Sequence, residues 1–360
     1  MKKIKWFSMM MIGGLVLSAC AAPATPPSTP TVTPTAGPVT LMVMTHDSFA
    51  AGEAVIAEFE RQNNVKLSFL KSGDAGAVVN RAILSKDTPL ADVLYGVDNA
   101  FLSRALDAGI FEQYNSPQLA AISSEFKLDP QNRALPVDFG DVCINYDKAY
   151  FDQKKLQVPQ SLEDLEKPEY KGLLVVENPA TSSPGLAFLL ATVAHFGQQG
   201  YLDYWKALRS NDVAVVNGWE IAYYTNFSGS SGKGAQPMVV SYNTSPAAEV
   251  VFATQPIDSS PTASINGPDT CFRQIEFVGI LKGTHQRALA EKFIDYMLDV
   301  SFQQDMPLQM YVYPVNPKAG LPEVFQKYAQ LPSQPARLDP DQIAKNRDAW
   351  IQAWNGVVLK

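Results

Sequence analysis

Hydrophobic and polar residues alternate along the first part of the folded chain in a pattern that predicts strands followed by helices. Three short apolar runs have the length of buried strands, at residues 39–44, 65–72 and 91–97. The segments after them carry apolar residues near helical spacing, at residues 49–64, 77–86 and 99–111. This order is typical of an α/β sheet covered by helices on both faces.

The rest of the chain continues the alternation. Further strands are predicted at residues 173–179, 212–216, 237–243 and 271–281. Helices are predicted at residues 182–197, with Ser183 as N-cap, at 286–306, and at 339–358, capped by Asp339 or Asp341. Residues 39–360 are too many for one compact core, so two lobes are expected.

The first residues predict export. Lysines at the start precede an apolar stretch, about Trp6–Val16, that is too short to span a bilayer, so residues 1–19 are interpreted as a signal peptide. The LSAC sequence resembles a bacterial lipobox, which predicts lipidation of Cys20; the alternative is an ordinary signal with a chance cysteine. Residues 20–38 are rich in proline and threonine and predict a tether. The expected protein is extracytoplasmic and lipid-anchored to the cell membrane, without spanning it.

Charge and cysteine content narrow the function further. The formal charge of −7 becomes −10 when the three lysines of the signal peptide are removed. No basic stripe is left, which argues against a nucleic-acid partner. Cys143 and Cys271 remain besides Cys20; an exported protein with this pair could hold a disulfide or two buried thiols.

The THDSF sequence at residues 45–49 has the letters of a hydrolase triad. Successive side chains of an extended strand point to opposite faces, so His46, Asp47 and Ser48 cannot converge as a triad, and the chain has no G-x-S-x-G elbow. An enzyme is therefore not expected. One alternative for Asp47 or Ser48 is that it caps the next helix.

Metal binding is also not expected, because the histidines are scattered and the chain has no C-x-x-C pair. The adjacent Tyr223 and Tyr224 leave ferric iron as an alternative ligand, since paired tyrosines bind ferric ion in some exported iron carriers.

Acidic residues follow three of the predicted strands. Asp47, Asp74 and Asp98 lie in loops at the carboxyl ends of strands, where α/β sheets bind ligands. Aromatic residues also recur at element ends, among them Trp219, Tyr242, Tyr311 and Tyr313. The sequence therefore predicts an acidic, aromatic cleft suited to a flat organic cation.

Seven segments in register carry a more specific resemblance. They are THDSFA (45–50), GDAGAVVNRAILSKDTPLADVLYGVDN (73–99), LPVDFGDVCINYDK (135–148), NPATSSPGLAFLL (178–190), NGWEIAYY (217–224), VVSYNTSPA (239–247) and YVYPVN (311–316). Together they resemble the thiamine-binding proteins of bacterial ABC importers over almost all of residues 40–355.

The resemblance implies the type II periplasmic-binding-protein fold, an α/β fold with two lobes, two strand crossovers and a ligand cleft between the lobes. Lobe 1 would comprise residues 39–139 and 272–325, and lobe 2 residues 140–271, with a C-terminal helical segment at 326–360 packing on both. The crossovers are expected near residues 136–142 and 271–277. Cys143 and Cys271 then lie just past the crossovers and are predicted to pair.

The resemblance also implies ligand contacts. Asp74 would lie near the thiazolium cation, Trp219 and Tyr242 would form aromatic walls, and Ser182 would place a helix start at a hydroxyl or phosphate. The complete set of candidate ligand-binding residues is His46, Asp47, Ser48, Asp74, Asp98, Ser182, Trp219, Tyr223, Tyr242, Asn243 and Tyr311.

Three positions depart from the family pattern. His46 and Tyr311 stand where relatives carry tyrosine and tryptophan, and Ala248 stands where relatives carry another tyrosine. Each lost stacking contact is worth about 0.5–1.5 kcal/mol beyond its buried area, so weaker stacking or a different ligand is expected.

The implied function is capture and delivery of thiamine or a thiamine phosphate, without a cofactor, by a protein expected to be a monomer. Its partners would be an ABC permease and that permease's ATPase subunits, since this chain has no Walker A motif. The alternatives are a thiamine precursor, a polyamine or another small cation, and ferric iron.

Overall fold

The structure, a computed structural model, describes residues 39–231 and 233–360. These residues form one compact unit. The predicted signal peptide, the lipidation site at Cys20 and the tether lie outside the described residues. Within the described ranges, no helix has the length and apolar character needed to cross a membrane.

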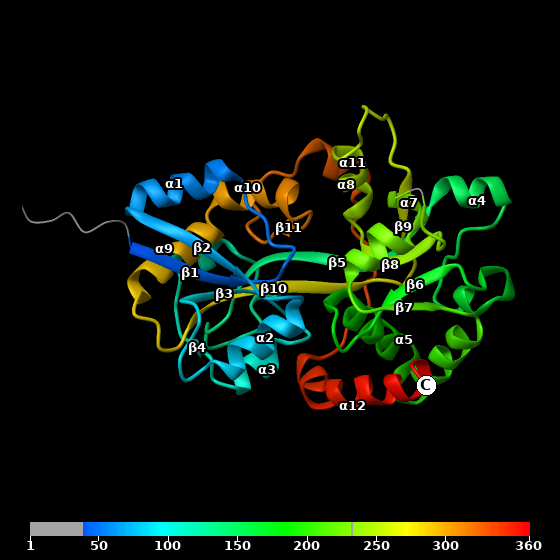
Figure 1. The fold of residues 1–360 in the computed structure, drawn as a ribbon, viewed down its shortest axis with the longest axis horizontal. Helices are drawn as coiled ribbons and strands as arrows, with labels where there is room; N and C mark the ends of the chain where they lie inside the picture. Colours follow the sequence, from blue (N-terminus) through cyan, green and yellow to red (C-terminus); the bar gives the residue numbers. More distant parts are fainter. Residues whose placement is uncertain (1–38, 232) are drawn as a thin grey trace, which may run out of the picture. The chain divides into compact units, whose positions relative to one another are not determined.

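One mixed sheet organises the described residues (Figure 1), and its main path runs in the order β2-β1-β3-β10-β5-β8-β6-β7. Its strands are β1 Val39–Thr45, β2 Val65–Lys71, β3 Val93–Asp98, β4 Phe111–Glu112, β5 Leu135–Asp147, β6 Leu174–Glu177, β7 Ala214–Val216, β8 Met238–Tyr242, β9 Thr262–Ile265, β10 Phe272–Leu281 and β11 Tyr313–Pro314. The strands β1, β2 and β3 are parallel to one another, and so are β6, β7 and β8.

Helices cover this sheet. They are α1 Glu53–Asn63, α2 Ala75–Leu84, α3 Leu102–Asp107, α4 Lys148–Lys154, α5 Ser183–Ser210, α6 Trp219–Ile221, α7 Ser228–Ser231, α8 Ser245–Val251, α9 Arg287–Leu298, α10 Val300–Gln309, α11 Glu323–Tyr328 and α12 Pro340–Val358. Short 3₁₀ turns lie at Pro117–Ala121, Ser124–Phe126, Glu163–Glu166 and Pro168–Tyr170, and a π-helical turn lies at Ala222–Asn226.

Two predicted helix boundaries were wrong, and one capping alternative was too. The N-cap of α5 is Ser182, so the helix begins at Ser183, one residue earlier than an N-cap at Ser183 would give. The single helix predicted over residues 286–306 is interrupted at Asp299, which is extended and whose carboxylate accepts from the Ser301 amide at 3.1 Å to start α10. Neither residue of the Asp47–Ser48 pair caps α1; its N-cap is Gly52. For α12, the N-cap is Asp339.

The long strands β5 and β10 connect the two halves of the sheet. They pair antiparallel with each other between Phe272–Glu276 and Asp138–Val142. Beyond this segment, β10 pairs with β3 and β5 pairs with β8. The predicted two-crossover α/β fold is therefore confirmed. Cys143 and Cys271, which flank the shared segment on the β8 side, are joined by a disulfide.

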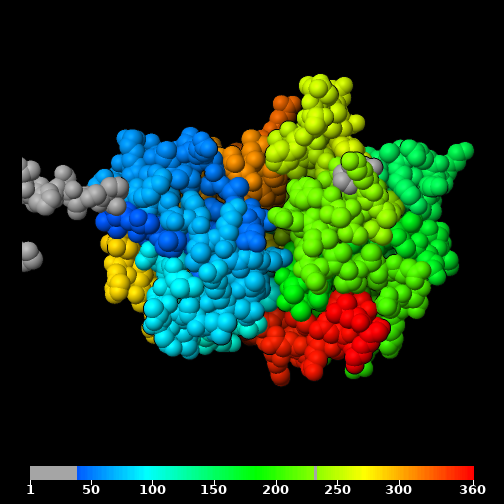
Figure 2. Space-filling model, in the orientation of Figure 1, coloured from blue at the N-terminus to red at the C-terminus, as the bar shows by residue number. Residues whose placement is uncertain are grey.

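The C-terminal helix α12 contacts both halves of this unit (Figure 1). Arg347 donates from Nη1 to the Ala100 carbonyl at 3.1 Å, next to α3. On the other half, the ring of Trp354 lies 5.4 Å from that of Trp205 on α5, edge to face. In Figure 2, residues coloured blue to cyan meet the green residues along one seam, and α12 (red) crosses its lower end.

Candidate functional site

Five carboxylates gather where the two halves of the sheet meet. Two of them end parallel strands, Asp98 in β3 and Glu177 in β6, and Asp74 is the N-cap of α2 directly after β2. The other two, Asp138 and Glu276, lie opposite each other in the shared segment of β5 and β10. Asp98, Asp138, Glu177 and Glu276 are buried and Asp74 is partly buried. We call these five side chains the carboxylate cluster.

His46 lies against this cluster and gives it a counter-charge when the imidazole is protonated. Its Nε2 lies 3.3 Å from Oε1 of Glu276. Gly96, with φ +94°, permits this placement, because a Cβ there would lie 2.3 Å from the imidazole Cδ2. The buried Tyr95 hydroxyl lies 2.7 Å from Oδ2 of Asp138 and 3.0 Å from Oε2 of Glu276. One hydroxyl proton cannot serve both carboxylates, so proton sharing among these groups is favoured.

Burial and charge shift the pKa values of these groups. Burial alone would lower the pKa of His46, but the attraction of Glu276 outweighs it and raises that pKa. Burial would raise the pKa of Glu276, but His46 outweighs it and the pKa is lowered. Burial, followed by the repulsion of Glu276, raises the pKa of Asp98 to about 7. The pKa of Glu177 is raised well above its usual value by burial and by Asp74.

A chain of hydrogen bonds connects β3 in one half with β8 in the other. The Ser183 hydroxyl donates to Asp98 and accepts from Nε2 of Gln274 at 3.1 Å. The Tyr242 hydroxyl then donates to Oε1 of Gln274 at 3.1 Å. The ring of Tyr242 lies over Gly140, where an added Cβ would come within 3.0 Å of it.

The start of α5 faces Asp74. The Ser182 hydroxyl and the Ser183 amide lie near enough to lower the pKa of this carboxyl, although burial, the larger effect, raises it overall. The Ser182 hydroxyl is buried and has no hydrogen bond of ordinary geometry, so its contact with Asp74 is a weak one.

An aromatic group lies beside β8. Trp219 donates from Nε1 to the Ser241 hydroxyl at 2.8 Å, and its ring stacks on that of Tyr223 at 5.0 Å. The Tyr223 hydroxyl donates to Glu249 at 2.7 Å, and the exposed Tyr224 ring packs edge-on against Tyr223 at 5.4 Å. This aromatic group therefore places the side chain of Glu249 next to the stacked rings of Trp219 and Tyr223.

Tyr311, in the other half, lies near Tyr224 of this aromatic group: burial and then Tyr224 raise the pKa of Tyr311 to about 12. It has a left-handed backbone with φ 54°, and its carbonyl accepts from the Thr244 hydroxyl at 2.5 Å. Its ring lies 5.2 Å from the ring of Phe252, which is 68% exposed at the end of α8. The amide of Phe252 donates to the Ala248 carbonyl, so both side chains lie on the same face of α8, one turn apart.

The structure sorts the candidate residues from the sequence into three sets. His46, Asp74, Asp98, Ser182 and Tyr242 adjoin the carboxylate cluster. Trp219, Tyr223 and Tyr311 belong to the aromatic group. The remaining three residues, Asp47, Ser48 and Asn243, contact neither set directly.

Those three have other surroundings. Asp47 is exposed and accepts from the Gly73 amide at 2.9 Å, which ties the ends of β1 and β2, and Ser48 is exposed. Asn243 donates to the Tyr313 hydroxyl at 3.1 Å and to the Gln330 carbonyl at 2.9 Å.

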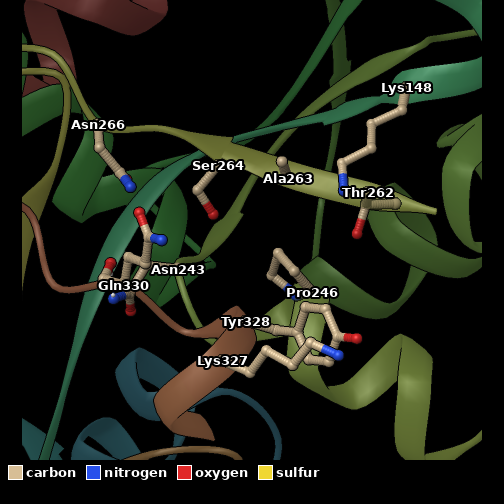
Figure 3. Close-up of a pocket in the computed structure, with 10 residues that line it drawn as sticks. All are labelled: Lys148, Asn243, Pro246, Thr262, Ala263, Ser264, Asn266, Lys327, Tyr328 and Gln330. Atoms are coloured by element: carbon tan, nitrogen blue, oxygen red, sulfur yellow. Dashed lines mark hydrogen bonds between the residues drawn. The ribbon is translucent and has the colours of Figure 1, made fainter. Parts of the chain in front are cut away.

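Asn243 also lines a separate cavity of about 160 Å³ (Figure 3). The cavity opens between β9 and α11, and the side chains of Lys148 and Lys327 reach it. Nζ of Lys148 donates to the Ser260 carbonyl at 2.9 Å, so this ammonium is held in place. Two cationic side chains make this cavity a poor site for a cation.

Sequence reasoning missed several residues of the site. They are Tyr95, Asp138, Glu177, Phe252, Gln274 and Glu276. A usable signal existed for Glu177, because it places a carboxylate in a strand that is otherwise wholly apolar. The signal for Glu276 was weaker, because its strand also carries Arg273 and Gln274. Phe252 could have been found by helical spacing, four residues after Ala248.

The described residues contain no group of three or more histidine, cysteine or acidic side chains arranged to hold a metal ion. The Tyr223 hydroxyl, one of the pair considered for ferric iron, is engaged by Glu249.

We expect the ligand-free protein to gain stability on mild acidification, on the order of 2 kcal/mol from about pH 8 to about pH 6. Asp98 and Glu177 have raised pKa values in the folded state, so the folded protein binds their protons more tightly than the unfolded chain does. The raised pKa of His46 acts in the same direction, and its contribution is lost as the pH rises through the folded-state pKa. Glu276, with a lowered pKa, opposes this gain only at more acidic pH.

Urea unfolding at several pH values measures this gain. Asp98→Asn should flatten the dependence of the free energy of unfolding on pH, because asparagine does not titrate. A free energy of unfolding that falls from pH 8 to pH 6 would contradict the prediction, because it would show that burial does not favour the protonated forms of these groups.

The chain is similar to known proteins over most of its length. The family described as "bacterial extracellular solute-binding protein" matches residues 88–346. The thiamine-binding periplasmic protein of Salmonella typhimurium strain LT2 is 31% identical over 350 residues, which are 96% of this chain and 98% of that protein.

Solved structures agree with this match. A periplasmic thiamin binding protein superposes with a TM-score of 0.77 at 29% identity, covering 89% of this chain and 96% of its own. Iron-bound HitA from Pseudomonas aeruginosa superposes with a TM-score of 0.73 at 19% identity, covering 88% and 99%, and this likeness concerns the fold alone. The fold is that of the type II periplasmic binding proteins.

Proposed function

The chain belongs to the family of bacterial extracellular solute-binding proteins, and from this premise we propose that it captures thiamine outside the cytoplasm and delivers it to an ABC permease. The observation that carries the choice of thiamine is the carboxylate cluster next to Tyr242 of β8, whose chain neighbour Ser241 accepts a hydrogen bond from Trp219 of the aromatic group. Thiamine is a permanent cation with two flat rings, and these two sets of residues match its charge and its ring faces.

Each set has a separate role in the proposal. Asp74 stands as the counter-ion of the thiazolium, with His46 beside the bound rings. Tyr242, Trp219 and Tyr311 stand as the aromatic walls, supported by the Trp219–Tyr223 stack. Asp98 holds the start of α5 through Ser183 and so positions the floor of the site.

Delivery depends on a change of conformation that the ligand favours. A ligand that contacts both halves has a higher affinity for the closed form and shifts the population toward it by that difference. The closed form would dock on the permease, whose ATPase subunits supply the energy. Lipidation of Cys20 would keep the protein at the membrane, with residues 20–38 as the tether.

Isothermal calorimetry of residues 39–360 tests the proposal. Thiamine, its phosphates, its pyrimidine precursor, putrescine and ferric citrate are titrated separately. Tight binding of thiamine with weak binding of putrescine and ferric citrate is expected. Tight binding of putrescine or ferric iron in place of thiamine would overturn the choice of ligand, while the solute-binding fold would stand.

Phe252→Ala should weaken thiamine binding by about 2- to 12-fold, the loss of one ring contact. Phe252 is exposed yet packs on Tyr311, and it lies one turn from the alanine that replaces a ring in relatives. Leu84→Ala, at a residue that is 88% exposed on α2, is the matched control and should leave the affinity unchanged. An unchanged affinity for Phe252→Ala would remove Phe252 from the site.

A further inference from the structure

The turn between β3 and α3, residues 98–101, is fixed within its own half of the sheet. Oδ1 of Asp98 accepts from the Ala100 and Phe101 amides at 2.8 and 3.0 Å. Asn99 ties the turn to the backbone of β10 in the shared segment, by two hydrogen bonds of 3.1 and 3.0 Å. We call these four residues the β3–α3 turn.

Arg347 of α12 contacts this turn with its guanidinium. The residue is 4% exposed, so its charge is buried and needs compensation. Nη1 donates to the Ala100 carbonyl at 3.1 Å, and Cζ lies 5.4 Å from the centre of the Phe101 ring. The neighbouring carboxylate of Asp348 lies 3.0 Å from Nη2 but is 80% exposed, so water screens it. The carbonyl and the ring of the turn therefore compensate much of the buried charge.

The C-terminal segment that carries Arg347, residues 330–358, is attached to the other half. The Gln330 carbonyl accepts from Nδ2 of Asn243, which follows β8, at 2.9 Å. The ring of Trp354 packs edge to face on α5. The segment is therefore expected to move with β6, β7 and β8, whereas the β3–α3 turn belongs to the half that contains β1, β2 and β3.

The β3–α3 turn adjoins the candidate site. Asp98 accepts from the Ser183 hydroxyl of α5, so the two halves are in contact here. Phe101 packs on the first turn of α2, where a Cβ on Gly76 would lie 3.0 Å from the ring. A rotation of the halves would move the guanidinium relative to the turn. A hydrogen bond of 3.1 Å is lost when its two atoms separate beyond about 3.5 Å, so a small rotation breaks this contact.

We propose that Arg347 is a positioning residue for ligand retention, whose contact with the β3–α3 turn stabilises the closed form and slows release of the ligand. This inference rests on the proposed function and goes beyond it, because it assigns control of release to a residue of the C-terminal helix. Ligand leaves from the open form. Loss of the contact therefore shifts the population toward that form and speeds dissociation by the same factor.

Stopped-flow tryptophan fluorescence with thiamine measures the two rate constants. Arg347→Met keeps the length and apolar packing of the side chain and removes its charge and donors. It should raise the dissociation rate constant about tenfold, the loss of one hydrogen bond from a charged group. The association rate constant should change by less than about twofold. Arg347→Lys keeps a charged donor and loses the planar contact with Phe101, so a rise of about threefold is expected.

Lys345→Met is the matched control, because Lys345 is exposed on the same helix and the substitution changes net charge equally. It should leave both rate constants unchanged. A dissociation rate constant equal to the native value in both Arg347 variants would overturn the inference, even if their melting temperatures fell, because Arg347 would then stabilise only the fold. If Arg347→Met does not fold, the lysine variant alone decides by the same criterion.

The absence of thiamine binding by the native protein would overturn the proposed function, and small-angle X-ray scattering without ligand then tests Arg347 by itself. Arg347→Met is expected to have a larger radius of gyration than the native protein and Lys345→Met, because its population shifts toward the open form. Equal radii in that case would overturn the inference as well.

Discussion

Asp74→Asn is expected to lower the affinity for thiamine by between about 30-fold and a few thousand-fold. Removing one partner of a buried charge pair costs about 2–5 kcal/mol, because the other charge is left without compensation. Asp74 is partly buried at the start of α2, and burial is the largest effect on its pKa, so water screens its charge less than that of a surface carboxylate. Calorimetry of the native and substituted proteins measures the loss.

The design of this substitution separates binding from folding. Asparagine is also a good N-cap, so α2 should still begin at the same residue and the melting temperature should change little. Asp87→Asn carries the same change of net charge on an exposed loop and is the matched control. A loss smaller than threefold with Asp74→Asn would place the thiazolium elsewhere in the carboxylate cluster.

Trp354→Ala is expected to lower the free energy of unfolding by about 3–5 kcal/mol, the usual cost of removing a large buried ring. Trp354 is 0% exposed and packs edge to face on Trp205 of α5. Urea unfolding monitored by circular dichroism measures the change. Gln352→Ala, at an exposed position of the same helix, should shift stability by less than about 0.5 kcal/mol. A comparable shift in both variants would mean that α12 contributes through its helix propensity and not through this contact.

The sequence predicted the fold well where local pattern and tertiary packing agree. The β1–α1–β2–α2–β3 order follows from short apolar runs and helical spacing, and both are properties of neighbouring residues. The break at Asp299 was missed, because the helical spacing of apolar residues continues across it. The break arises because the Asp299 carboxylate accepts a hydrogen bond from a backbone amide at the start of α10.

The candidate site was predictable in part for the same reason. Asp74 and Asp98 follow strands, and the rule that ligands bind at the carboxyl ends of strands placed both correctly in one region. The same rule misled for Asp47, which ties β1 to β2 at the surface. Asp138 and Glu276 face each other only because β5 and β10 pair in a particular register, and one chain alone does not reveal that register.

The crossing of β5 and β10 has a mechanical consequence. Asp138, Gln274 and Glu276 lie in the segment that both halves share, so these residues of the candidate site lie at the pivot about which the halves would turn. A small rotation of the two halves moves atoms at the pivot very little and moves atoms at the far ends of the halves much further. The helices α1 and α4 lie at opposite ends of the sheet in Figure 1. A distance measured spectroscopically between labels on these two helices would therefore change more on ligand binding than a signal from a probe beside the ligand.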